Sequence, residues 1–146
     1  MSEPVSEFVV RLEQIRDYEF RVNFGKPELA DLIVDEPPPL GHDAGPNPSR
    51  LLAAAVVNCL AASFLFCSRR ARVETGPVTA EVKVQMVRNQ DKRLRIGRME
   101  VVIDPHLPEG EIEKARRCRE IFEDFCVVTQ SVRNGLDVSV QVKGFD

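Results

Sequence analysis

The feature that most constrains this chain is a nearly continuous apolar run from Leu51 to Cys67, interrupted only by Asn58 and Ser63. The run is shorter than the roughly 20 apolar residues that a helix needs to cross a bilayer. In a soluble chain, a helix that is apolar on all sides is a buried one. We therefore expect a central helix that packs against its own sheet and can also pack against a second subunit. We do not expect it to span a membrane.

The residues around this run indicate where the helix begins and ends. The segment from Asp35 to Pro46 is rich in Pro, Gly and Asp, which break helices and strands, and it predicts a long loop. Asn47 is a favourable N-cap, and Pro48 suits the first turn of a helix. Arg69 and Arg70 complement the negative end of the helix dipole. The helix is thus predicted from Pro48 to about Arg70.

Alternation of apolar and polar residues predicts the strands. Three strands precede the loop, in the ranges 8–13, 18–24 and 29–34, with a hairpin turn at Arg16–Asp17. Two strands follow the helix, in the ranges 78–86 and 94–103. In the second of these the inward-facing positions change parity across Gly97, which predicts a bulge there.

The last third of the chain predicts two helices and a strand. Pro108 and the glutamates after it start an amphipathic helix that reaches about Asp124. A short helix follows from Cys126 to Arg133, closed by Asn134–Gly135, and the range 136–142 alternates as a final strand. This order predicts one α+β domain over residues 1–146, with an antiparallel sheet and helices on one side of it.

Charge and the N-terminal residues limit the partners and the compartment. The net charge is -3 with interspersed signs, so the chain has no basic surface for nucleic acid. The N-terminal residues lack the basic and apolar regions of a signal peptide. We therefore expect a cytoplasmic protein whose four cysteines begin as thiols.

Two of the four cysteines are candidates for chemistry. No pair has the close spacing that presents zinc ligands on a tight turn, so no metal is expected. Cys67 and Cys118 lie on apolar helix faces and are interpreted as structural. Cys59 lies beside the polar Asn58 in the apolar helix, and Cys126 opens a helix, where free N–H groups favour a thiolate. Simple packing is the alternative for both.

The contexts of these two cysteines resemble those of a known family. Gly45-Pro46-Asn47-Pro48 opens the apolar helix that leads to Cys59, and Phe125-Cys126-Val127-Val128-Thr129-Gln130-Ser131-Val132 precedes the final strand. The combination spans essentially the whole chain and is similar to the family of osmotically inducible protein C and the organic hydroperoxide resistance proteins. The resemblance implies an intertwined homodimer in which an antiparallel sheet wraps around two central helices, with active sites at the subunit interface.

The resemblance also implies an activity. In the active members the first cysteine, here Cys59, attacks an organic hydroperoxide as a thiolate and becomes a sulfenic acid. The second, here Cys126, resolves the sulfenic acid as a disulfide, and an external dithiol reduces the pair. No metal, haem or other cofactor is implied.

The sequence departs from the family's pattern near Cys59. Active members carry a glutamate where Ser49 stands and an arginine in the preceding loop, but residues 35–46 contain no Arg or Lys. Arg50 and Arg21 are candidates for the missing cation, from the same or the partner subunit. His42 could tune the site, although an exposed loop residue is the favoured interpretation. His106 is assigned no role.

Two functions are therefore carried forward. The leading hypothesis is a thiol peroxidase of the oxidative-stress response that uses Cys59 and Cys126. The alternative is a catalytically weak dimer that acts as a redox-sensing or small-molecule-binding module, because the family's glutamate and arginine are absent.

Overall fold

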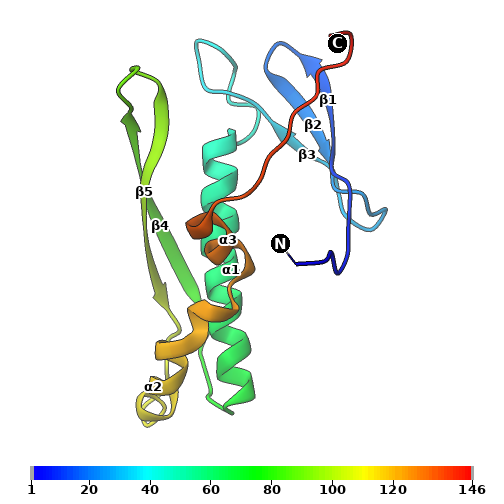
Figure 1. The fold of residues 1–146 in the computed structure, drawn as a ribbon. Coiled ribbons are helices and arrows are strands. Elements are labelled where there is room, and N and C mark those ends of the chain that lie inside the picture. The colour runs from blue at the N-terminus through cyan, green and yellow to red at the C-terminus, as the bar shows by residue number, and fades with distance from the viewer. Residues whose placement is uncertain (1, 146) are drawn as a thin grey trace. The chain divides into compact units, whose positions relative to one another are not determined.

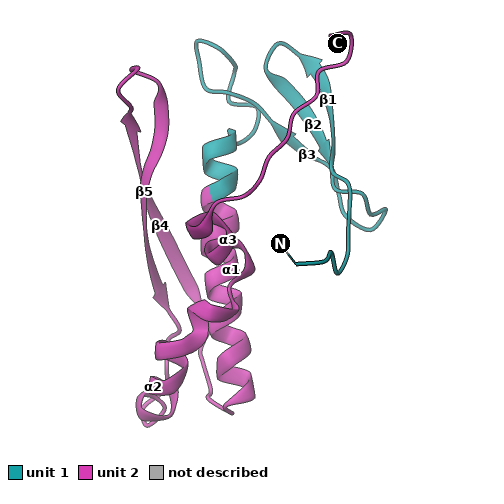
Figure 2. Ribbon diagram, in the orientation of Figure 1, with its two compact units in different colours: residues 1–52 teal, residues 53–146 magenta. Residues whose placement is uncertain are grey.

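The structure is a computed structural model that describes residues 2–145. The chain divides between Leu52 and Ala53 into two compact units, coloured separately in Figure 2. The first unit holds a three-stranded sheet, and the second holds a two-stranded sheet with most of the helical residues. All strand pairs are antiparallel, so the predicted α+β class is confirmed.

The first unit is a small antiparallel sheet in the order β1-β2-β3. Its strands are β1 (Arg11–Arg16), β2 (Glu19–Asn23) and β3 (Leu32–Val34), joined at the first turn by Asp17 with a φ of 47°. The predicted hairpin is confirmed, but β1 begins and ends three residues later than expected, and β3 begins three residues later and is correspondingly shorter. Periodicity shows which residues can form a strand, whereas strand ends depend on where a neighbouring strand supplies hydrogen bonds.

Asp35 organises the long loop that follows β3, a role that the sequence did not reveal. Its carboxylate is buried and accepts the backbone N–H groups of Glu36 at 2.8 Å, His42 at 3.0 Å and Ala44 at 3.1 Å. Burial raises the pKa of Asp35, but these three hydrogen bonds favour the charged form and the net effect lowers its pKa. The loop is therefore folded around one carboxylate.

Helix α1 (Pro48–Arg70) begins and ends where the sequence predicts. The Asn47 side chain accepts the backbone N–H of Arg50 at 3.0 Å, which is the expected N-cap contact. By length and hydropathy α1 could cross a membrane, a property that core helices of soluble proteins share. Within the described residues α1 is not buried on all sides, because an exposed stripe runs along it through Ala54, Asn58, Ala62 and Phe66.

In the second unit, β4 (Thr79–Arg88) and β5 (Leu94–Asp104) form a hairpin beside α1 (Figure 1). Gln85 pairs with Arg98 and Met86 with Ile96, which leaves Gly97 as the extra residue. The predicted bulge is confirmed. A Cβ atom at Gly97 would lie 2.7 Å from Val87 Cγ1, so only glycine fits without a shift of that side chain.

The predicted second helix is shorter than expected. Residues from Pro108 form a turn in which Gly110 has a φ of 89°, so α2 (Ile112–Ile121) begins after it. A 3-10 helix, η1 (Phe122–Phe125), continues the chain, and α3 (Val127–Asn134) ends at Gly135 as predicted.

The predicted C-terminal strand is absent from the described structure. Residues 136–141 have no regular secondary structure, because no strand of the described chain pairs with them. An alternating sequence supplies the side-chain pattern of a strand, but the strand forms only where a neighbour completes its backbone hydrogen bonds.

A disulfide corrects the expectation that all four cysteines are thiols. Cys67, near the end of α1, is bonded to Cys118 in α2, with a Cα–Cα distance of 5.7 Å. Both side chains are buried and pack with Phe64, Ile121 and Phe122. The sequence placed both cysteines on buried faces but could not show that the two faces meet.

This disulfide should contribute substantially to stability. It joins residues 51 apart in the sequence, and closing a loop of that length in the unfolded chain stabilises the fold by about 4 kcal/mol. In a C59A/C126A background, a reductant should lower the free energy of unfolding in urea by about that amount. A variant that also carries C67A and C118A is the control and should not respond to the reductant. Equal stability with and without reductant in both proteins would contradict the prediction.

Candidate functional site

Cys126 lies at the junction between η1 and α3, where the backbone turns from one helix into the next. It has an extended conformation, with φ -83° and ψ 100°, and it is the N-cap of α3. Its sulfur accepts the backbone N–H of Thr129 at 3.4 Å, and its thiol donates to Thr129 Oγ1 at 3.0 Å. Cys126 is therefore in the N-cap position that usually holds Ser, Thr, Asp or Asn.

The surroundings of Cys126 favour its thiolate. Burial raises the pKa of Cys126, since the side chain is only 1% exposed. Hydrogen bonds from the Thr129 hydroxyl, Cys59, the Thr129 amide and Ser63 act in the opposite direction, and the net effect lowers the pKa of Cys126 below its usual value. The lowered pKa arises from a helix terminus and hydroxyl groups rather than from a neighbouring cation.

The structure brings Cys59 and Cys126 together. Cys59 is half-buried on α1 and packs against the cluster of Val56, Leu60 and Cys126. Both residues are free cysteines, and Cys59 is one of the neighbours that lower the pKa of Cys126. Asn58, expected beside Cys59 in the interior, is exposed instead, because it falls on the exposed stripe of α1.

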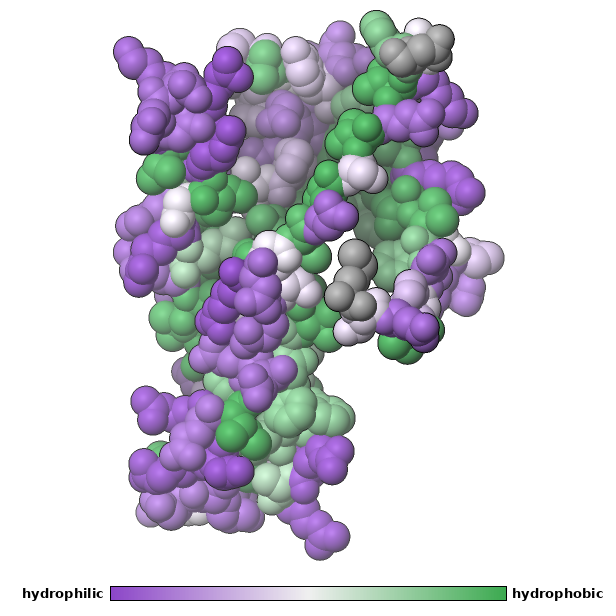
Figure 3. Space-filling model, in the orientation of Figure 1, coloured by the Kyte–Doolittle hydropathy of each residue, from purple (hydrophilic) through white to green (hydrophobic). Residues whose placement is uncertain are grey.

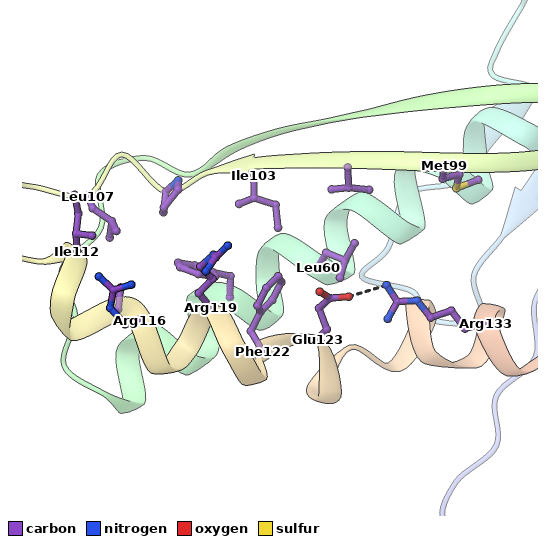
Figure 4. A pocket seen from close by; sticks show the side chains of 14 residues that line it. Leu60, Met99, Ile103, Leu107, Ile112, Arg116, Arg119, Phe122, Glu123 and Arg133 are labelled. Carbon is purple, nitrogen blue, oxygen red and sulfur yellow. Dashed lines mark hydrogen bonds and ion pairs between the residues drawn. The ribbon is translucent and has the colours of Figure 1, made fainter.

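The second unit contains an apolar cavity of about 480 Å³, and neither cysteine is among the residues that line it (Figure 4). Its walls come from α1, β5, α2 and the η1–α3 segment. Leu60, Met99, Val101, Ile103 and Phe122 line the cavity and also belong to, or pack against, the cluster that contains Cys126. The cavity thus shares a wall with the two cysteines.

Arginines of α2 and α3 face the same cavity, a feature that the sequence analysis missed. Arg116 is paired with Glu113 at 2.9 Å and Arg133 with Glu123 at 2.6 Å. Arg119 also lines the cavity and has no ion pair among the described residues. In α2, Arg119 comes four residues after Ala115 and therefore lies on the same face of the helix, which is the signal that was available.

The supporting residues proposed from the sequence all belong to the first unit: Arg21, His42, Ser49 and Arg50. Ser49 lies partly buried in the first turn of α1, and Arg50 beside it is exposed. Arg21 makes long ion pairs, at 3.7 Å to Glu13 and 3.9 Å to Asp31. His42 is exposed and is held through its backbone N–H by Asp35.

Among residues 2–145, no three His, Cys, Asp or Glu side chains are grouped closely enough to hold a metal ion. The groups that surround the Cys126 thiol are the hydroxyl groups of Thr129 and Ser63, the Cys59 side chain and the backbone N–H of Thr129 at the start of α3.

Comparison with known proteins gives one family and one fold. The sequence pattern of the family described as OsmC-like protein matches residues 41–141. An OsmC-like protein from Mycoplasma pneumoniae is similar in structure with a TM-score of 0.73 and 13% identity, covering 89% of each chain. The organic hydroperoxide resistance protein OhrB of Bacillus subtilis has a TM-score of 0.62 and 20% identity, covering 96% of this chain and 100% of its own.

A third solved structure, an OsmC-like protein of unknown function from Vibrio cholerae, has a TM-score of 0.69 and 14% identity, covering 87% of this chain and 94% of its own. No curated protein matches the sequence at a significant level. At these identities the solved structures show a shared fold, and the match over residues 41–141 shows the family.

The contacts around Cys126 predict a specific effect of Thr129. In a C59S background, T129V should raise the pKa of Cys126, because it removes the hydroxyl that accepts from the thiol at 3.0 Å and that would donate to the thiolate. Since a raised pKa leaves less thiolate at a given pH, the rise in thiolate ultraviolet absorbance should move to higher pH, by roughly one pH unit. T129S retains the hydroxyl and is the matched control. Identical titrations of the two variants would contradict the assigned role.

Proposed function

Because the chain belongs to the OsmC-like protein family, we propose that it is a thiol peroxidase that reduces organic hydroperoxides through Cys59 and Cys126. The observation that carries the proposal is that both free cysteines lie together beside an apolar cavity. Defence against oxidative stress in the cytoplasm is part of the same proposal. The names of solved relatives, including organic hydroperoxide resistance proteins from Bacillus subtilis and Legionella pneumophila, support this substrate class.

The proposed chemistry needs only the two sulfurs and an external reductant. One thiolate attacks a peroxide oxygen, the O–O bond breaks, and the alcohol leaves with a proton, so that the sulfur becomes a sulfenic acid. The second thiol attacks that sulfur, releases water and forms a disulfide. A dithiol then restores both thiols by exchange, and no metal or bound cofactor takes part.

The cavity supports an organic hydroperoxide over hydrogen peroxide. Most of its lining is aliphatic or aromatic, including Leu60, Phe64, Ile103 and Phe122. Apolar substituents of a hydroperoxide would leave water on entering such a cavity, and each buried methylene contributes about 0.8 kcal/mol. Hydrogen peroxide has no apolar part and gains nothing from this lining.

The alternative function is a redox-sensing or small-molecule-binding module that reacts slowly. Ser49 and the loop without Arg or Lys favour it, because the groups that hold the thiolate in active members of the family are replaced. In this case the cavity beside the cysteines would bind a small molecule. Oxidation of the two thiols would then act as a redox signal and would not serve to remove peroxide.

We also propose that the protein is a homodimer, as the family resemblance implies. Apolar positions are left exposed on two described elements: the C-terminal segment, with Val138 at 75% and Val140 at 82%, and the stripe of α1 that includes Phe66. Figure 3 shows apolar residues along the course of the C-terminal segment. An extended apolar segment with unpaired backbone groups is suited to form a strand with a second copy.

Substitution on one face of this segment tests the dimer. Val138 and Val140 share the apolar face, so V138E/V140E should weaken self-association roughly a hundredfold or more, by removing buried valines and introducing charge. S139E/Q141E adds the same charge to the other face and should leave the dimer intact. Sedimentation equilibrium measures both. A monomeric wild-type protein, or equal loss in both variants, would refute the proposal.

Direct oxidation tests the activity. The reduced protein receives one equivalent of cumene hydroperoxide, and peptide mapping without reductant locates the disulfides. A Cys59–Cys126 disulfide should form within seconds, and hydrogen peroxide should react at least about tenfold more slowly because it cannot use the apolar cavity. C59S should prevent that disulfide. Thiols that stay reduced for many minutes would favour the binding module instead.

A further inference from the structure

The cavity of the second unit combines an apolar lining with a positive charge on the wall that α2 forms. We propose that this cavity binds a linear monocarboxylate, with the carboxylate on Arg119 and the alkyl chain against the apolar lining. The inference goes beyond the proposed function, because neither thiol lines the cavity and the binding needs neither of them.

The charges around the cavity leave one guanidinium without a counter-ion. Three arginines line the cavity, and two of them are neutralised: Arg116 pairs with Glu113 at 2.9 Å, and Arg133 pairs with Glu123 at 2.6 Å. Glu123 is the one acidic side chain among the described lining residues, so none is left for Arg119. The cavity therefore has a net positive charge that a bound anion would neutralise.

Two buried residues fix the part of α2 that presents Arg119. Cys118, directly before it, is 1% exposed and is bonded to Cys67 of α1, and Ala115, one turn earlier, is 3% exposed. The Arg119 side chain itself is exposed, and Figure 4 shows it extending from α2 toward β5. The guanidinium is thus carried by an anchored backbone, which lowers the entropy lost when a ligand binds.

The rest of the lining suits an alkyl chain. Leu60, Phe64, Ile103, Leu107 and Phe122 contribute most of the apolar surface of the cavity, from α1, β5, η1 and the residues after β5. Its volume of about 480 Å³ lies within the range of roughly 300 to 1,000 Å³ that is usual for small-molecule sites. Each methylene that leaves water for this lining should tighten binding about fourfold.

The single unpaired guanidinium favours a carboxylate over other charged groups. A planar guanidinium can donate two parallel N–H hydrogen bonds to one carboxylate, and the two groups neutralise each other. A phosphate monoester carries nearly two negative charges at neutral pH and would leave one of them unpaired beside Glu123. An alkylammonium would be repelled by Arg119.

Binding of decanoate tests the site, because decanoate has no peroxide group. Isothermal titration calorimetry should show at least about tenfold weaker binding to R119Q than to the wild-type protein, since a charged hydrogen-bonded pair is lost. R117Q removes the neighbouring arginine, which does not line the cavity, and is the matched control that should bind like the wild type. Circular dichroism verifies that both variants are folded.

Two further ligands separate the charged contact from the apolar one. Octanoate is two methylenes shorter and should bind the wild-type protein about fifteenfold more weakly than decanoate. 1-Decanol retains the chain without the charge, so its affinity should be the same for R119Q and the wild type. Equal binding of decanoate to R119Q and the wild type, or equal binding of octanoate and decanoate, would overturn the proposal.

The remaining outcomes identify a different occupant. C59S/C126S should bind decanoate like the wild type, and loss of binding in that variant would overturn the proposal by placing the ligand at the thiols. If a second copy of the chain fills the cavity, decanoate will not bind and R119Q will weaken self-association in sedimentation equilibrium, which also overturns it. None of these results depends on peroxide chemistry, so the oxidation experiment decides the proposed function separately.

Discussion

The second unit depends on the burial of the apolar surface of α1. Two clusters form along this helix: Val56 and Leu60 pack with Cys126, and one turn further on Phe64 and Cys67 pack with Cys118. β5, α2 and α3 are each held by one or both clusters. Because the interior of a small domain is close-packed, the helix that supplies most of that interior also fixes where the other elements can lie.

The spacing of cysteines on α1 separates two kinds of sulfur chemistry. Cys59 and Cys67 are a little over two helical turns apart, which is about 12 Å along the axis. The disulfide at Cys67 joins α1 to the helix that forms one side of the cavity, whereas Cys59 stays free beside Cys126. One helix therefore carries both a disulfide-bonded cysteine and a free one, at a separation too large for the two to bond to each other.

In the described chain, apolar surface is left uncovered on one stripe of α1 and along the C-terminal segment. The stripe of Ala54, Asn58, Ala62 and Phe66 includes two alanines, whose small side chains permit the close approach of another helix. The C-terminal segment has the alternation of a strand without a strand to pair with. A two-stranded sheet such as β4–β5 is marginal by itself. The proposed homodimer would cover both apolar surfaces and give the unpaired strands a partner.

The sequence by itself determined the local structure. Capping residues set the limits of α1 and the end of the helix after Cys126, and the change in inward-facing positions located the bulge at Gly97. These signals come from residues near one another in the chain. The tertiary structure decided the Cys67–Cys118 bond, the contact between Cys59 and Cys126, the carboxylate at the centre of the loop and the absence of a final strand. Each of these depends on which distant groups meet, and periodicity carries no information about such distances.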